Sequence, residues 1–571
     1  MKTKFITNSF RVVALTTLLL SGQSCKNVLD EQVISNIGND YINTPKGFED
    51  AVRAAYSSLR NFYASERGLT MTEYGTDIYR AGADGSYKGF HFYDSQLNSS
   101  YDIIQQVWDE LYRAINTCNA IIERAPTTAG VSDATKKLRV AEAKFLRAHY
   151  YFILTQQFGG IDLRLTETLG PTKKVTRATE ADMYKAIVAD LEAAIPDLDP
   201  KIRSSDYGRA TKGAAEHLLA RVYLTKATSS AKATDDYAKA ATLAQSVISN
   251  YSFKLLPDFA SVFAQGAGEI NDEVIFAVQY TSDPLTNINS ANPNNGDGNK
   301  LHLYFGMQYD VQPGMKRDIA NDRPFKRLRP TTYLLETVFK DRVNDSRYKK
   351  TFKDTWYSNN PNTPANPAFN TSFDNSKAKV TFKAGDTAIY IPGVEWTLAQ
   401  RAAKPYQVLV PSLYNAALFP TLQKFLDPLR PDLTYEQGSR DYLAFRLAET
   451  YLILAEAQLK QGKTAEAATA INAVRRRAAY PGREAAMEVT PAQMDMNLIY
   501  EERARELAGE QTRWFDLKRW GNLVERVKAY NPDAAANVKE INNLRPIPQT
   551  QIDRSDKAAD GSPGFAQNPG Y

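Results

Sequence analysis

Residues 442–474 read YLAFRLAETYLILAEAQLKQGKTAEAATAINAV, and their apolar positions recur at helical spacing. The two apolar faces are Tyr442, Phe445, Leu447, Tyr451, Leu452 and Ala455, then Ala465, Ala468, Ile471 and Val474. The turn formers Gln461, Gly462 and Lys463 separate them. Recurrence every three to four residues is typical of amphipathic helices, so the stretch predicts a helical hairpin. Small alanines let the two helices lie close together, as in tetratricopeptide-like repeats.

The same pattern extends toward the N-terminus. Further helical faces occupy residues 48–59, 108–122, 145–154 with 184–195, and 218–223 with 237–248. We therefore predict a mostly α fold, in which tetratricopeptide-like helical hairpins form a scaffold. The helical frame spans about 41–250 and 441–530.

Two segments, about 64–100 and 251–440, interrupt this pattern and are rich in Asn, Pro, Gly and Asp. The second contains NPNNGDG at 292–298 and NNPN at 359–362, which predict loops. The apolar run VIFAV at 274–278 predicts a short strand. Loops on a rigid frame commonly carry binding sites, so we expect both inserts to face a ligand.

The composition limits the class of partner. Residues 1–24 hold three basic residues and no acidic one, so the remainder carries 67 basic against 65 acidic residues, a net charge of +2. Nucleic-acid binding needs a concentrated basic surface, so none is expected. After the N-terminal segment, no apolar run reaches the length of a membrane-spanning helix.

The first 25 residues indicate export. Lys2, Lys4 and Arg11 precede the apolar run 12–20, which is too short to span a bilayer, and SGQS at 21–24 leads to Cys25. This resembles a bacterial lipoprotein signal, so we predict a signal peptide at 1–24 and a lipid on Cys25. Gly22 stands where such signals usually have a large aliphatic residue, which leaves an ordinary signal peptide as the alternative.

Motifs for catalysis or metal binding are missing from the sequence. The four histidines lie far apart, and HExxH, GxSxG and CxxC do not occur. Asn295, Asp297 and Asn299 alternate as calcium ligands do, but Gly306 stands where a bidentate Glu is needed. We expect no metal, no cofactor other than the lipid, and no enzymatic activity. Glu501, Glu502, Arg503 and Glu506 are interpreted as a solvated helix face.

Several motifs in order resemble the SusD/RagB family of outer-membrane nutrient-binding lipoproteins. They are SCKNVLD at 24–30, AEAKFLRA at 141–148, FGG at 158–160, RLAETYLILAEA at 446–457, INAVR at 471–475, IYEERAREL at 499–507, RWFDLKRWG at 513–521, LRPIP at 544–548 and QNPGY at 567–571. Their Glu-rich and Arg-rich helices alternate in charge, so the charges could pair across neighbouring helices.

The resemblance implies a single domain over 25–571 that is anchored by its lipid in the outer membrane and faces the cell exterior. It also implies non-catalytic capture of oligosaccharide and delivery to a SusC-type TonB-dependent transporter. The alternatives are a peptide-binding member of the family and an exported glycoside hydrolase on a helical scaffold, since a glycosidase needs only two acids brought together by the fold.

Sugar rings stack on exposed aromatic side chains that have polar neighbours. The inserts supply such rings, and we expect two or three of them to be exposed on one surface. The predicted ligand-binding residues are Tyr74, Tyr79, Tyr87, Phe90, Tyr304, Tyr309 and Trp356, with Trp396 as a further candidate.

Overall fold

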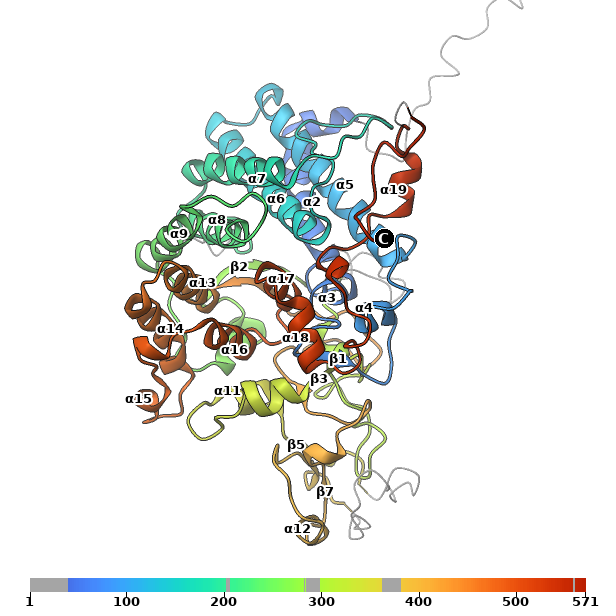
Figure 1. The fold of residues 1–571 in the computed structure, drawn as a ribbon, viewed down its shortest axis with the longest axis vertical. Helices are drawn as coiled ribbons and strands as arrows, with labels where there is room; N and C mark the ends of the chain where they lie inside the picture. The colour runs from blue at the N-terminus through green and yellow to red at the C-terminus, as the bar shows by residue number, and fades with distance from the viewer. Residues whose placement is uncertain (1–38, 202–205, 282, 284–297, 362–381, 558–559) are drawn as a thin grey trace, which may run out of the picture.

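The computed structural model describes residues 39–201, 206–281, 283, 298–361, 382–557 and 560–571. Cys25 and the pair Asn295 and Asp297 lie outside these ranges. Long helices pack side by side in an arc, and the part of the chain that contains β5, β7 and α12 extends away from them (Figure 1). No helix within the described ranges is long and apolar enough to cross a membrane.

The arc contains the predicted hairpins. Its helices are α2 (Pro45–Ser57), α5 (Asp102–Arg124), α6 (Asp133–Phe158), α7 (Glu180–Ala194), α8 (Lys212–Lys226), α9 (Asp236–Asn250), α13 (Leu447–Lys460), α14 (Thr464–Ala478) and α16 (Met496–Glu506). Helices adjacent in sequence pack together, and α9 packs against α13, which joins the two halves of the frame. The prediction of a mostly α, hairpin-based scaffold is confirmed.

Helix ends are set by local side-chain hydrogen bonds. Thr179 and Asp182 form a capping box at the start of α7, and Ser132 caps α6. Each cap satisfies backbone N–H groups that lack a partner inside the helix.

The remaining helices are short. They are η1 (Asn39–Asn43), η2 (Ser58–Asn61), α3 (Glu66–Thr72), α4 (Lys88–Phe92), η3 (Ala125–Thr127), η4 (Ile195–Asp197), η6 (Ala260–Phe263), η7 (Gly266–Gly268), α10 (Leu301–Tyr304), η8 (Tyr333–Val338), α11 (Arg347–Thr351), α12 (Leu398–Ala402), η10 (Pro411–Leu413), α15 (Glu484–Met487), η11 (Pro491–Gln493), α17 (Arg513–Arg519), α18 (Leu523–Tyr530), η12 (Glu540–Asn543) and α19 (Gln549–Arg554).

The described strands are short and lie mainly in the inserts. They are β1 (Tyr79–Ala81), β2 (Val274–Val278), β3 (Leu328–Pro330), β4 (Phe352–Lys353), β5 (Thr355–Tyr357), β6 (Thr387–Tyr390), β7 (Gln407–Val408), β8 (Thr421–Leu422) and β9 (Tyr442–Arg446). The pairs β1–β3, β2–β9, β4–β8 and β5–β6 are antiparallel, and β6–β7 is parallel.

Strand β9 corrects one sequence assignment. Tyr442 and Phe445 were placed on a helical face, but they belong to β9, which pairs with β2 and continues directly into α13 at Leu447. The predicted strand at 274–278 is confirmed as β2.

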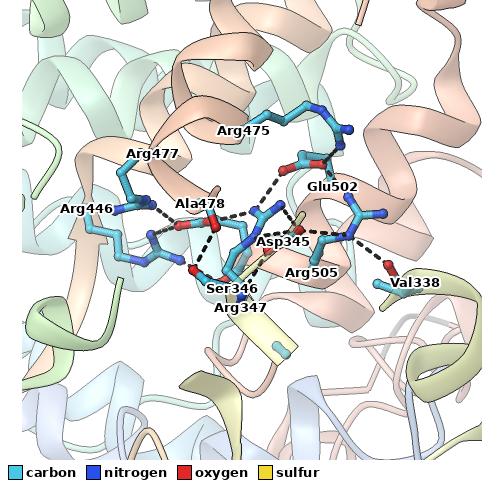
Figure 2. Close-up of polar contacts among 12 residues, drawn as sticks. Val338, Asp345, Ser346, Arg347, Arg446, Arg475, Arg477, Ala478, Glu502 and Arg505 are labelled. Carbon is cyan, nitrogen blue, oxygen red and sulfur yellow. Dashed lines mark hydrogen bonds and ion pairs between the residues drawn. The ribbon is translucent and has the colours of Figure 1, made fainter. Parts of the chain in front are cut away.

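A buried ionic network joins the frame to the second insert (Figure 2). Glu502 of α16 lies 2.7 Å from both Arg347 of α11 and Arg475 of α14. Glu506, one turn further along α16, lies 2.8 Å from Arg347 and 2.6 Å from Arg446 at the end of β9, and also pairs with Arg477. The network therefore ties α11, α14, α16 and β9 together.

The network corrects the interpretation of the α16 charges as a solvated face. Glu502, Arg503 and Glu506 are buried, whereas the predicted pairing across neighbouring helices is confirmed. Burial alone would raise the pKa of Glu502, but Arg347, Arg505 and Arg475 outweigh it and lower the pKa to about 2. Both buried carboxylates are therefore ionised at neutral pH.

Candidate functional site

Most of the predicted ligand-binding rings lie in the core. Tyr74, Tyr79, Phe90 and Tyr304 belong to the main hydrophobic core, whereas Tyr309 and Trp356 belong to a separate core inside the second insert. Each of these six side chains is at most 1% exposed.

The expectation that two or three of the rings share an exposed surface is therefore wrong for these six. The physical reason is that the first insert, together with Tyr304, packs into the main core, whereas the rest of the second insert needs a core of its own. Tyr74 stacks on His91 with ring centroids 4.0 Å apart, and Tyr309 donates a hydrogen bond to the Asp322 carbonyl at 2.7 Å. Trp396 is half-buried and packs against Tyr390 at 5.7 Å.

Two of the predicted residues nevertheless line one pocket of about 200 Å³, which we call the two-insert pocket. Its lining residues are Arg60, Ser65, Glu66, Arg67, Tyr87, Ile103, Gln106, Gly298, Lys300 and Tyr304. Tyr87 comes from the first insert and Tyr304 from the second, so the pocket lies where both predicted ligand-facing segments meet.

Tyr87 is held in an unusual backbone conformation. It precedes α4 with φ of +61°, in the left-handed region that a bulky L-residue rarely adopts. Such conformations cost on the order of 1–3 kcal/mol and tend to occur at functional sites. The half-buried ring contacts Tyr101, with centroids 5.8 Å apart.

The two phenols are available for hydrogen bonding. Within the described residues, neither the Tyr87 nor the Tyr304 hydroxyl forms a hydrogen bond. Burial raises the pKa of Tyr87 and raises that of Tyr304 well above its ordinary value, so both groups stay protonated at neutral pH. Each hydroxyl can therefore both donate and accept.

A guanidinium group completes the polar lining. The Arg67 Nε–H donates to the Gln106 side chain at 3.0 Å, and Gln106 donates to Asp102 at 3.2 Å. These two hydrogen bonds orient the planar guanidinium group of Arg67. Glu66 is paired with Arg327, whose guanidinium also lies over the Tyr304 ring at 5.3 Å. The pocket thus presents neutral hydroxyls and an oriented cation.

Arg67, Gln106 and Lys300 were not identified from the sequence. Arg67 lies in the first turn of α3 and Gln106 in the second turn of α5, where a polar residue usually faces solvent, and only the meeting of the two inserts reveals them. Asn299, once considered as a calcium ligand, donates to the Arg440 carbonyl at 2.9 Å and accepts from the Leu301 N–H at 2.9 Å. Its side chain thus stabilises the backbone beside the pocket.

A buried carboxyl lies at the end of α3, within the first insert. Glu73 accepts a hydrogen bond from the Thr512 N–H at 3.1 Å through Oε1, whereas Oε2 has no partner among the described residues. Burial raises the pKa of Glu73 to about 8. The folded protein therefore holds a proton that the unfolded chain releases above pH 4.5.

We expect Glu73→Gln to remove a pH dependence of stability. Because the folded state binds the extra proton, the free energy of unfolding should fall as the pH rises from 4.5 to about 8, by roughly 1.4 kcal/mol per pH unit. Gln has the shape of the protonated carboxyl and should flatten this slope. Urea unfolding at pH 5 and pH 8 measures it, with exposed Glu466→Gln as the control. Equal slopes in wild type and Glu73→Gln would contradict the assignment.

The comparisons with known proteins agree with this architecture. Residues 272–571 match the SusD family, and residues 37–224 match a family described as starch-binding associating with outer membrane. SusD-like protein P25 of Formosa agariphila is 24% identical over 558 residues, which cover 95% of this chain and 96% of that protein.

Solved structures share the fold along nearly the whole chain. A laminarin binding SusD-like protein superposes with a TM-score of 0.68 at 22% identity, covering 92% of this chain and 100% of that one. Surface glycan-binding protein A from Bacteroides thetaiotaomicron, in complex with laminarihexaose, gives a TM-score of 0.64 at 20% identity, covering 92% and 99%. Since the SusD match spans more than half of the sequence, the chain belongs to the SusD family.

Proposed function

We propose that the protein captures oligosaccharide in the two-insert pocket and holds it, uncleaved, for a SusC-type TonB-dependent transporter. The observation that carries this is the convergence of two unbonded tyrosine hydroxyls and an oriented Arg67 on one pocket, in a member of the SusD family. Sugar hydroxyls are satisfied by such neutral donors and acceptors and by planar guanidinium groups.

Electrostatics favours binding over hydrolysis at this pocket. Glycosidases use two carboxyl groups about 5–9.5 Å apart. Glu66 is the sole acid among the pocket-lining residues that the structure describes, and its charge is paired with Arg327. The lining therefore suits retention of an intact glycan.

The family match and the N-terminal signal support a proposal for the cellular location. We propose that the mature protein is anchored in the outer membrane by a lipid on Cys25 and faces the cell exterior. There it would meet glycans before the transporter does.

We expect the double variant Tyr87→Phe, Tyr304→Phe to bind glycan about tenfold more weakly than the wild type. Both rings stay in place, so packing is kept, and each lost hydrogen bond costs about 0.5–1.5 kcal/mol. Affinity electrophoresis in gels containing laminarin, amylopectin, xylan or galactomannan measures retention. Laminarin heads the panel because two relatives with this fold are described with laminarin-type ligands.

Tyr357→Phe is the matched control, because this tyrosine lies in β5 outside the pocket and is 61% exposed. It should keep wild-type retention. Thermal unfolding of all variants should match that of the wild type. If the double variant folds normally and is retained as well as the wild type, the ligand does not bind in the two-insert pocket.

A further inference from the structure

We propose a second saccharide-binding site on the helical frame, in a cavity of about 360 Å³ that we call the α5–α19 pocket. This rests on the proposed function, since it assigns a second contact for the same class of ligand. The volume lies within the roughly 300–1,000 Å³ typical of small-molecule sites. The pocket lies between α5, the segment 162–175 and α19, which lies beside α5 (Figure 1).

An aromatic wall forms one side of the α5–α19 pocket. Trp108 and Tyr112 are one turn apart on α5, and their rings lie 5.0 Å from each other. Trp108 is only 2% exposed, yet its indole N–H forms no hydrogen bond with any residue in the described ranges. An indole N–H without a protein partner can donate to a ligand acceptor.

Unpaired polar side chains from two elements surround the wall. Asp109 of α5 and Arg554 of α19 are both exposed, and no ion pair of either occurs among the described residues. The Gln551 amide lines the same cavity and is likewise unbonded within those residues. A carboxylate, a guanidinium and an amide together match the vicinal hydroxyls of a sugar, and the half-buried Tyr112 ring supplies an apolar contact beside them.

The loop that closes the α5–α19 pocket is already fixed by α5. Asn116 accepts from the Thr168 N–H at 2.7 Å and donates to its carbonyl at 3.2 Å. Asn119 donates to the Thr166 carbonyl at 2.8 Å. Binding there would therefore order few additional groups, which reduces its entropic cost.

A larger cavity of about 390 Å³, between α2 and β2, lacks this combination. Its Arg209 lies 2.7 Å from Glu142 and its Arg53 2.8 Å from Asp50. The Tyr56 and Tyr207 hydroxyls are bonded to the backbone of Ala210 and Glu269. Since these groups are already paired, the observations favour the α5–α19 pocket.

One helix carries both proposed sites. Gln106 lines the two-insert pocket and Trp108 the α5–α19 pocket, and two residues correspond to about 200° around a helix. A long glycan that reaches both would gain affinity through effective concentration. We expect the affinity for polysaccharide to depend on both sites. We expect a short oligosaccharide to bind with a stoichiometry of two molecules per protein.

The test is the triple variant Asp109→Ala, Gln551→Ala, Arg554→Ala, none of which belongs to a hydrophobic core. Arg113→Ala, an exposed residue of α5 that does not line the pocket, is the control. Retention in gels of laminarin, amylopectin, xylan and galactomannan should weaken roughly tenfold for the triple variant and remain unchanged for the control. Titration with the hexasaccharide of the retained glycan should give two equivalents for wild type and one for the triple variant.

The outcomes separate the two proposals. If wild type is retained and the folded triple variant matches it in affinity and stoichiometry, the second site is wrong and the two-insert pocket stands. The same result is expected if the α5–α19 pocket binds a protein instead of a glycan. If the wild type is retained by none of the gels, both proposals fail.

Discussion

Replacing Glu506 with Gln is expected to lower the free energy of unfolding by about 3–5 kcal/mol. Gln keeps the shape of the side chain but removes the charge that faces Arg347, Arg446 and Arg477. These guanidinium groups are buried, so water cannot replace the lost partner. Removing one member of a buried ionic group leaves the others uncompensated, which is why the effect is large.

The control is Glu488→Gln. Glu488 also pairs with an arginine, Arg476, at 2.9 Å, but both side chains are more than 40% exposed. Exposed pairs contribute about 0–1 kcal/mol. Chemical denaturation of the three proteins measures the difference. Similar losses for Glu506→Gln and Glu488→Gln would show that the network does not support the frame.

The Glu506→Gln variant should also differ from the wild type in how its stability depends on pH. Burial opposes ionisation of Glu506, but Arg477, Arg446 and Arg347 hold its pKa below the ordinary value of 4.5. A carboxyl whose folded pKa is depressed stabilises the protein above its unfolded pKa, and this stabilisation is lost as the pH falls below it. Wild type should therefore lose stability on acidification below pH 4.5 more steeply than Glu506→Gln.

Cys25→Ala is expected to move essentially all of the protein from the membrane fraction to the soluble fraction. Each CH₂ of an acyl chain that is buried in the bilayer contributes about 0.8 kcal/mol to membrane binding. Stable anchoring needs two membrane-binding signals, such as two acyl chains. No helix in the described part of the chain is long and apolar enough to span a membrane. Fractionation should be done in cells that lack the partner transporter, so that protein contacts do not retain the variant.

Cys118→Ser is the control, since Cys118 is buried in α5 and free of disulfides. The Cys118→Ser protein should remain in the membrane fraction and should incorporate a palmitate label. The double variant Cys25→Ala, Cys118→Ser should not incorporate the label. Labelling with a palmitate analogue distinguishes the two cysteines. A Cys25→Ala protein that stays with the membrane in these cells would rule out the lipid anchor.

The helical frame could be predicted from the sequence because its buried faces repeat at the period of a single helix. Of the face predicted for α14, Ala468, Ile471 and Val474 are buried as this spacing requires, whereas Ala465 in its first turn is exposed. Tyr442 and Phe445 were misassigned because β9 runs straight into α13, so their spacing also fits a helix. Their true partner, β2, lies more than 160 residues earlier in the chain.

The charges and the site depended on contacts that no local pattern contains. Glu502 and Glu506 have the i, i+4 spacing of a solvated face, yet arginines from α11, α14 and β9 bury them. Insert aromatics such as Tyr74 and Trp356 resemble stacking residues in composition but serve as core. Tyr87 and Tyr304 were predicted separately, and only the fold shows that they line one pocket.

The central claim, capture of glycan without cleavage at the two-insert pocket, is tested most directly by one binding measurement with product analysis. The detergent-solubilised protein is titrated with the retained glycan, and the mixture is then assayed for new reducing ends. The account predicts saturable binding that weakens about tenfold in the Tyr87→Phe, Tyr304→Phe variant, with no new reducing ends in either sample. Accumulation of reducing ends, or full affinity in that variant, would contradict it.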